Sequence, residues 1–281
     1  MKTQRNETSA PQEITLVLNA AEGRLQVAAG NACADGTQQA GLLFSFEMTV
    51  PRQGTEILAP AIQDAMKRMR VSMQQIGRIA VVNGPGGFTG LRLALSTALG
   101  MARALNVPCA GVSYTAALAA DAAAVLHAAD CGSPLLWAVL HARRDQVMVQ
   151  GFRPDNTGTA VPLHPVTTFG VADACSHMAA VTQSCGCKAC LFGSGVQRNA
   201  EAICRHLTAA GISHSLLPAR FSHVRPEALL AATADAVWSH EPVEPEYVRG
   251  CDAEENLPRM AAARGMQPEK AVEALHRLTT S

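Results

Sequence analysis

The fold is decided by one stretch, Asn83-Gly84-Pro85-Gly86-Gly87-Phe88-Thr89-Gly90-Leu91-Arg92, which joins a short apolar run to a long run rich in Ala and Leu. The run 78–83 predicts a buried strand and 91–105 predicts a helix. Glycines between them permit positive φ angles and close approach of other backbone. The residues leave two interpretations open, a tight strand-to-helix connection or a phosphate cradle. A cradle would be neither a P-loop, because no Lys-Ser/Thr follows the last glycine, nor a dinucleotide fingerprint, because Thr89 replaces the third glycine.

Strands and helices alternate on both sides of this stretch. Before it, the pattern predicts strands at 14–19, 24–29 and 41–48 and an amphipathic helix over 54–70. After it, a short strand begins at 109–112, and a related order restarts. That second series comprises strands at 135–142, 146–152 and 161–165, helices at 170–182, 197–210 and 225–239, and short strands near 190–193 and 213–217.

The two series share an opening. Residues 17–27 align without a gap on residues 139–149, and both segments predict a strand, a tight turn and a second strand. Two copies of a β-β-β-α-β-α unit would form the α/β architecture of the ribonuclease-H-like, actin-type (ASKHA) superfamily, with two such domains in tandem. We therefore expect domains at 13–112 and 113–250, a disordered segment at 1–12, and a C-terminal extension at 251–281 with a short helix over 268–278.

Composition excludes several classes of function. The 281 residues carry 23 Lys+Arg against 23 Asp+Glu and only 4% aromatic residues, which argues against a chain that binds nucleic acid on its own. No segment approaches the about 18 to 20 consecutive apolar residues that cross a bilayer, and residues 1–12 lack the apolar stretch of a secretory signal. Nine Cys, an odd number, favour reduced thiols. We expect a cytoplasmic protein without a membrane contact.

The glycine-rich stretch closely resembles a family signature. Residues 84–92 resemble the G-P-G-S-F-T-G-L-R sequence of the TsaB (YeaZ) family, a glycoprotease-like relative of TsaD. Residues 96–102, 108–113, Ala142-Arg143 and 245–249 resemble further segments of that family, so the resemblance runs from about residue 14 to 250. The site residues that it implies form the glycine-rich loop: Gly84, Pro85, Gly86, Gly87, Phe88, Thr89, Gly90 and Arg92.

The resemblance implies a supporting subunit rather than an enzyme. Members of the TsaB family belong to the bacterial machinery that forms N6-threonylcarbamoyladenosine beside the anticodon of tRNAs. There they support a TsaD-like transferase, which a TsaE-like ATPase joins. The chain would then reach tRNA only indirectly through the complex and need no cofactor of its own. A nucleotide at the partner interface, and a homodimer when TsaD is absent, stay open.

Two departures from the family pattern bear on catalysis. The first strand ends in Asn19-Ala20-Ala21 where the family has Asp-Thr-Ser, and His141 replaces an Asp in the second hairpin. An acidic residue at such a turn helps actin-type kinases to hold Mg²⁺ against phosphates, and neither position supplies one. We therefore predict no catalytic residues. An actin-type ATPase or small-molecule kinase is the alternative function.

A cysteine cluster supports a third interpretation. Cys185, Cys187 and Cys190 form a C-x-C-x-x-C pattern, and Cys175 precedes them. Four thiolates of this kind are candidate ligands for zinc, which would make the chain a metal- or redox-sensing domain. The simpler interpretation is an unligated loop that enters a strand. A zinc peptidase is not expected, because no H-E-x-x-H pattern is present.

The helices predicted over 54–70 and 91–105 have broad apolar faces. Part of each face must pack on the sheet of its own domain. In the TsaB family these helices contact TsaD or a second TsaB copy. The partner interface that this resemblance implies consists of Leu58, Ile62, Ala65, Met66, Met69, Leu91, Leu95, Ala98, Leu99 and Ala102. Arg92 and Arg143 match family positions, and Arg92 at a helix N-terminus does not stabilise the helix. We expect Arg92 to make an interdomain or partner contact; the alternative for both arginines is an ordinary position on the surface or at a helix start.

Overall fold

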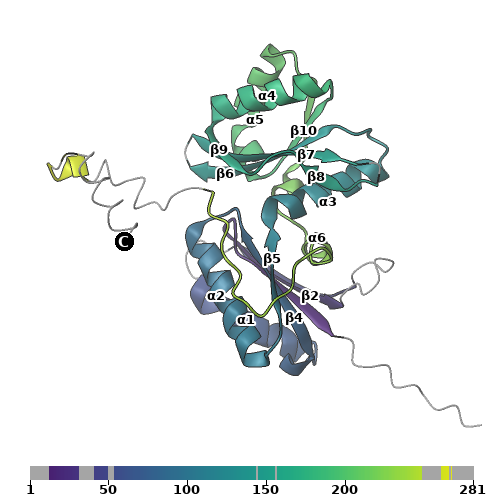
Figure 1. Ribbon diagram of the computed structural model, residues 1–281, viewed down its shortest axis with the longest axis vertical. Coiled ribbons are helices and arrows are strands. Elements are labelled where there is room, and N and C mark those ends of the chain that lie inside the picture. The colour runs from purple at the N-terminus through teal and green to yellow at the C-terminus, as the bar shows by residue number, and fades with distance from the viewer. Residues whose placement is uncertain are drawn as a thin grey trace, which may run out of the picture. The chain divides into compact units, whose positions relative to one another are not determined.

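The computed structural model (Figure 1) describes residues 13–31, 41–49, 54–143, 145–155, 157–248, 261–265 and 267. Residues 1–246 form one compact unit and residues 247–281 a second. The predicted disordered segment 1–12 and the predicted helix 268–278 lie outside the described residues, as does most of the extension 251–281. The predicted boundary between residues 112 and 113 stays a prediction.

The first sheet contains five strands in the order β3-β2-β1-β4-β5. These are β1 (Ile14–Asn19), β2 (Arg24–Asn31), β3 (Leu42–Thr49), β4 (Ile76–Gly84) and β5 (Cys109–Ser113). β1 pairs antiparallel with β2 and parallel with β4, and its six residues are all buried. The five strands confirm the sequence predictions to within two residues, because their apolar runs are short and bounded by turns.

Two helices pack on one side of this sheet and contact each other (Figure 1). They are α1 (Gly54–Arg68) and α2 (Phe88–Leu105), and the 3₁₀ helix η1 (Met73–Gln75) lies between them in sequence. Each helix turns a stripe of apolar side chains inward, spaced as in any amphipathic helix. α2 ends at Asn106, whose φ of 55° closes the last turn in the left-handed conformation.

The second sheet repeats the strand order of the first. Its strands are β6 (Leu135–Arg143), β7 (Gln146–Pro154), β8 (Ala160–Pro162), β9 (Thr167–Gly170), β10 (Ala189–Phe192) and β11 (His214–Leu216). The order is β11-β10-β6-β7-β8, and β9 also pairs with β7. Its opening strand β6 is antiparallel to β7 and parallel to β10, just as β1 is antiparallel to β2 and parallel to β4 in the first sheet. Helices α4 (Val171–Cys185) and α5 (Ser194–Ala209) pack against it.

The predicted strand 161–165 is wrong in its bounds, because only its start lies in a strand, β8, and the next strand, β9, begins after it. β8 ends at Pro162, and Pro165 stands between β8 and β9. Proline has no N–H to donate to a ladder, so a continuous strand through both prolines is disfavoured. β8 and β9 instead pair with different parts of β7.

One helix that the sequence analysis left unassigned connects the two sheets. α3 (Tyr114–Ala128) contacts β4 and β5 of the first sheet and β6, β7 and β8 of the second. Its Asp121 carboxylate accepts hydrogen bonds from the guanidinium of Arg225, whose Nε lies 2.9 Å from one oxygen and 3.1 Å from the other. Asp121 is 3% exposed, so this charge depends on its partner.

The helix predicted over 225–239 is much shorter in the structure. α6 (Pro226–Ala231) follows the 3₁₀ helix η2 (Ala219–Ser222) and packs on β2, on the side of the first sheet opposite α1 and α2 (Figure 1). Just after α6, the hydroxyl of Thr233 donates a hydrogen bond to the Leu230 carbonyl at 2.7 Å. Such side-chain hydrogen bonds compete with continued helix.

The chain after α6 returns to the first sheet. The backbone N–H of Ser239 donates to the Cys109 carbonyl at 2.9 Å, and Cys109 N–H donates to Ser239 at 2.7 Å. Further on, Glu246 N–H donates to the Asn83 carbonyl at 2.7 Å, and the Asn83 amide donates to Glu244. Residues 239–246 are therefore bonded to the first sheet at two points, the start of β5 and the end of β4.

Candidate functional site: a polar cavity between the two sheets

The glycine-rich loop packs against the turn between β1 and β2. Gly87 N–H donates to the Ala21 carbonyl at 2.7 Å. A Cβ at Gly90 would lie 1.9 Å from the Ala20 oxygen, and a Cβ at Gly86 would lie 2.6 Å from the Ala21 oxygen. Both distances are too short for any side chain, so the glycines are required for this contact. The tight-connection interpretation of the loop thus has a structural reason.

The remaining loop residues lie at its two ends. Gly84, with a φ of 149°, precedes Pro85 through a cis peptide bond, and its missing Cβ leaves room for the Glu246 carbonyl oxygen. Phe88 and Thr89 are exposed at the start of α2. The guanidinium carbon of Arg92 lies 4.0 Å from the centre of the Phe88 ring, a cation–π contact within one helix turn.

Asn19 has a structural role in the hairpin turn. Its side-chain oxygen accepts a hydrogen bond from Ala21 N–H at 2.9 Å, and its amide donates to the Gln26 side chain at 2.5 Å. Gln26 in turn donates to the Val224 carbonyl at 2.8 Å. The amide at the position where the family has Asp is therefore used within the turn, so it holds the turn together rather than facing a ligand.

A cavity of about 480 Å³ lies beside this contact. The β1–β2 turn and the glycine-rich loop line one side. Residues of β6, β7 and α5, and two residues at the end of η2, line the other. The lining is mostly polar and consists of Ala21, Glu22, Gly23, Gly86, Gly87, His141, Met148, Ser194, Gln197, Arg198, Ser222 and His223. The sequence analysis singled out Ala21, the loop glycines Gly86 and Gly87, and His141, but not the rest.

Glu22 is the carboxylate in this cavity. Ser194 Oγ donates to Glu22 Oε1 at 2.6 Å, and Ser194 Oγ itself accepts from the backbone N–H of His141 at 2.9 Å. Burial raises the pKa of Glu22 from 4.5 to about 7, although the hydrogen bond from Ser194, the nearby hydroxyl of Tyr114 and the charge of Arg198 oppose the shift. Its second oxygen, Oε2, is buried and has no hydrogen-bond partner.

Two histidines in the cavity wall are held neutral. Burial lowers the pKa of His223 from 6.5 to about 4, with Arg24 adding to the effect. Burial and then Arg198 lower the pKa of His141. His223 Nδ1 lies 3.3 Å from the Tyr114 hydroxyl, whereas His141 Nδ1 is buried without a partner. The cavity thus presents neutral imidazoles beside one carboxyl group and one guanidinium.

The predicted partner interface is largely buried within the protein. Seven of its ten residues are at most 9% exposed and pack under their own helices: Leu58, Ile62, Met66, Leu91, Leu95, Ala98 and Ala102. That part of the prediction is wrong, because the sheet takes the apolar face of each helix. Ala65 and Leu99 are part-exposed and Met69 is 46% exposed, so these three remain accessible to a partner.

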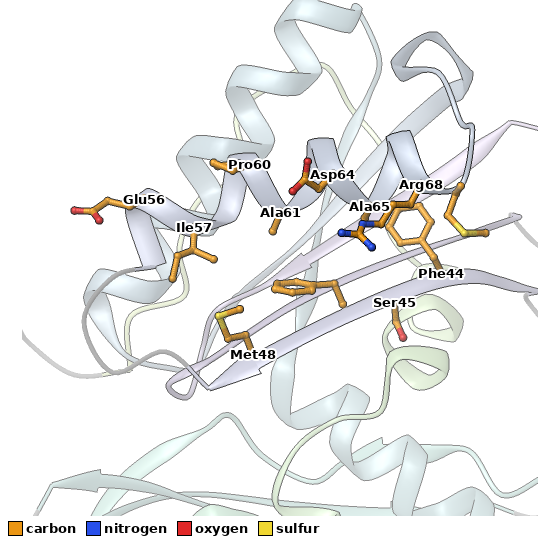
Figure 2. Close-up of a pocket in the computed structure, with 12 residues that line it drawn as sticks. Phe44, Ser45, Met48, Glu56, Ile57, Pro60, Ala61, Asp64, Ala65 and Arg68 are labelled. Atoms are coloured by element: carbon orange, nitrogen blue, oxygen red, sulfur yellow. The ribbon is translucent and has the colours of Figure 1, made fainter.

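An apolar groove of about 620 Å³ lies between α1 and the edge strand β3 (Figure 2). Phe44, Phe46 and Met48 alternate along β3 and line the groove together with Ile57 and Ala65 of α1. Glu56, Asp64 and Arg68 add charge at its rim. The alternating apolar pattern at 42–48 was the sequence signal for this groove, although it was used only to predict the strand.

The four candidate cysteines lie in different surroundings. Among the residues that the structure describes, no three His, Cys, Asp or Glu side chains converge as ligands. Cys175 and Cys190 are buried in the core, and burial raises the pKa of Cys175 to about 11. Cys185 accepts from Arg153 at 3.0 Å, and Cys187 contacts the Cys185 carbonyl at 3.3 Å. No three ligands thus converge at these cysteines among the described residues, and the zinc interpretation stays a prediction.

The described part of the chain has no helix that is both long and apolar enough to pass through a bilayer. Its α/β fold with two mixed sheets matches two solved structures from Pseudomonas aeruginosa. One is an uncharacterized protein with similarity to peptidase YEAZ, with a TM-score of 0.60 and 22% identity over 84% of this chain and 100% of that one. The other, YeaZ, has a TM-score of 0.58 and 21% identity over 84% and 99% of the two chains. Both likenesses concern the fold.

The sequence comparisons identify the family. A family model described as TsaD, tRNA N6-adenosine threonylcarbamoyltransferase, matches residues 49–232. The chain therefore belongs to this family. Within the family it resembles the TsaB (YeaZ) members. The tRNA threonylcarbamoyladenosine biosynthesis protein TsaB of Escherichia coli is 30% identical over 46% of this chain and 54% of its own length. TsaB of Buchnera aphidicola subsp. Baizongia pistaciae is 43% identical over 19% of this chain. The match thus spans about half of the Escherichia coli relative and 24% of the Buchnera one.

Proposed function

We propose that this chain is a non-catalytic subunit of a complex that forms N6-threonylcarbamoyladenosine in tRNA, and that it acts by binding a TsaD-like transferase. Family membership and the names of its relatives support the process. The observation that carries the non-catalytic role is the use of the Asn19 side chain within its own turn. A site for Mg²⁺ and phosphate needs carboxylate oxygens at that position.

The architecture that supports this role is two ribonuclease-H-like, actin-type domains in tandem. The repeated strand order of the two sheets supports this proposal. A TsaE-like ATPase joins the complex, tRNA is reached through the TsaD-like subunit, and the complex works in the cytoplasm. The chain needs no cofactor of its own for a role based on contact between proteins.

The outer side of α2 is the docking face in this proposal. Leu99 is part-exposed there, and the neighbouring Gly100 has open space around it, since a Cβ at Gly100 would meet nothing within 4 Å. A glycine on an exposed helix face allows a partner helix to approach closely. Ala65 and Met69 of α1 extend the accessible surface. A second copy of the chain would compete for the same face.

A bulky substitution tests this face without disturbing the core. Gly100→Trp should fold, because the space is open, but should abolish binding to the TsaD-like protein of the same organism in a pull-down. Ala180→Trp, on the exposed side of α4, is the matched control and should bind normally. Undiminished binding by Gly100→Trp would overturn the docking face.

Reconstitution tests the function itself. The chain is combined with the TsaD-like and TsaE-like proteins, tRNA and L-threonylcarbamoyl-adenylate, and modified adenosine is measured. We expect modification to require the chain and to be lost with Gly100→Trp. Equal modification without the chain would refute the proposal. Turnover of ATP by the isolated chain would favour the actin-type ATPase instead.

A further inference from the structure

Buried polar atoms without a hydrogen-bond partner are concentrated in one place. Glu22 Oε2, His141 Nδ1 and Ser222 Oγ have no partner among the described residues, and all three belong to residues that line the cavity between the sheets. Ser222 is only 7% exposed. Buried polar groups are nearly always paired, because each unpaired one costs about 1–3 kcal/mol. Three such groups in one cavity indicate a ligand that satisfies them.

The cavity favours an anion on one side. α5 begins at Ser194, and its N-cap residue, Gly193, supplies no side-chain hydrogen bond to the first turn. The N–H groups of a first helical turn and the helix dipole attract negative charge. Arg198, one turn further along α5, also lines the cavity and acts electrostatically on both Glu22 and His141. A carboxylate group would be stabilised here.

The cavity favours a cation on the other side. Glu22 uses one oxygen to accept from Ser194 and leaves the other buried and unpaired. An ammonium group has three N–H donors and a full positive charge, so it would satisfy that oxygen and stabilise the ionised carboxylate. A phosphate ester would instead bring negative charge towards Glu22. A divalent cation would find only this one carboxylate, because no further acidic side chain lines the cavity.

We propose that this cavity binds a small zwitterion of the amino-acid class, with its ammonium group at Glu22 Oε2 and its carboxylate at Arg198 and the N-terminus of α5. His141 Nδ1 and Ser222 Oγ contact the polar atoms of its side chain. The ligand then bridges the two sheets, since Glu22 belongs to the β1–β2 turn and Arg198 to α5. The volume of about 480 Å³ is ample for an amino acid.

Proton release distinguishes this binding mode. Because burial raises the pKa of Glu22 to about 7, much of the carboxyl is protonated at pH 6.5, and an ammonium ligand that favours the ionised form displaces that proton. Affinity should therefore rise as the pH increases through 7. The charged and titratable groups that face Glu22 or its neighbours are Arg198 of α5, Tyr114 of α3, His141 of β6, Arg24 of β2 and His223. His223, with a pKa of about 4, stays neutral over that range.

The test uses the isolated full chain, so its result is independent of docking to a TsaD-like protein. Binding of the twenty common L-amino acids is measured one at a time by saturation-transfer NMR, and the best ligand is then measured by calorimetry at pH 6.5 and pH 8. Acetate, ethylammonium, glycerol and inorganic phosphate serve as partial ligands. We expect at least one amino acid to bind, more tightly at pH 8 and with proton release at pH 6.5, and the partial ligands to bind far more weakly.

Variants assign the binding to this cavity. Glu22→Gln and Ser222→Ala should each weaken binding about tenfold or more, because each removes one hydrogen-bonding group that the ligand satisfies. Ser184→Ala, which changes an exposed hydroxyl on α4, is the control and should leave affinity unchanged. Binding of no amino acid, equal binding of a partial ligand, or binding that both cavity variants leave unchanged would overturn the proposal.

Discussion

Glu22→Gln should make the protein more stable at high pH relative to low pH. In the folded chain the carboxyl holds its proton up to a pKa of about 7, whereas in the unfolded chain it releases the proton near 4.5. The folded state therefore binds more protons between these values, and its stability falls as the pH rises from 4.5 to 7. Each pKa unit is worth about 1.4 kcal/mol, so the penalty at pH 8 reaches about 3 kcal/mol.

Glutamine removes this penalty and keeps the hydrogen bond. Its side-chain oxygen can still accept from Ser194 Oγ, and it does not titrate. The unpaired amide that it introduces has a destabilising effect, but that effect is independent of pH. His223, whose low pKa stabilises the fold as the pH rises from about 4 to 6.5, is present in both proteins and cancels in their difference.

The measurement is urea unfolding of both proteins at intervals between about pH 4.5 and about pH 8. The unfolding free energy of Glu22→Gln minus that of the parent chain should rise by about 3 kcal/mol across this range. Glu201→Gln, at an exposed position on α5 where the side chain pairs with Arg205, should give a small and nearly flat difference. Parallel pH curves for the parent chain and Glu22→Gln would refute the argument from burial.

Three further predictions concern packing, charge and thiol reactivity. Gly90→Ala should destabilise the fold by about 3 kcal/mol or more, because the added Cβ would overlap the β1–β2 turn. Gly100→Ala in the same helix should stabilise the fold by about 0.5–1 kcal/mol, because the added Cβ meets open space. Thermal unfolding measures both changes. Arg225→Met should cost about 2–3 kcal/mol in urea unfolding, because the buried carboxylate of Asp121 loses its partner, and a change below 1 kcal/mol would contradict this. Cys175 should resist iodoacetamide at pH 8 in the folded chain and react after unfolding, as mass spectrometry of the peptide would show.

The strands could be predicted because their signal is local. Short apolar runs that end at turn residues predict β1, β2, β4 and β6. The gapless alignment of 17–27 on 139–149 predicted that both sheets begin with the same hairpin, β1–β2 and β6–β7. α3 was missed for a physical reason. It packs against both sheets, so it is apolar around most of its surface and lacks the one-sided stripe by which a surface helix is recognised.

The site was harder to predict because its residues come from distant segments. The glycine-rich loop was found from its sequence, but its neighbours, Ala20 and Ala21, lie more than sixty residues earlier. Ser194 and Glu22 are separated by 172 residues, and no local pattern marks either of them. The same limit explains why most of the predicted partner interface is buried instead. Apolar spacing shows that a helix face is buried, but not whether its own sheet or a partner covers it, and here the sheet covers Leu58 and Leu91.

The return of the chain to the β5 edge has a consequence for synthesis on the ribosome. Asn83 and Glu244 are bonded although 161 residues separate them, and Ser239 pairs with Cys109 across 130 residues. β4 and β5 therefore leave the ribosome long before the segment that covers their edge exists. An incomplete chain that stops before Ser239 would carry an open strand edge, on which strands of other nascent chains can add. The last part of the unit to be made is therefore the part that pairs with the start of this edge strand.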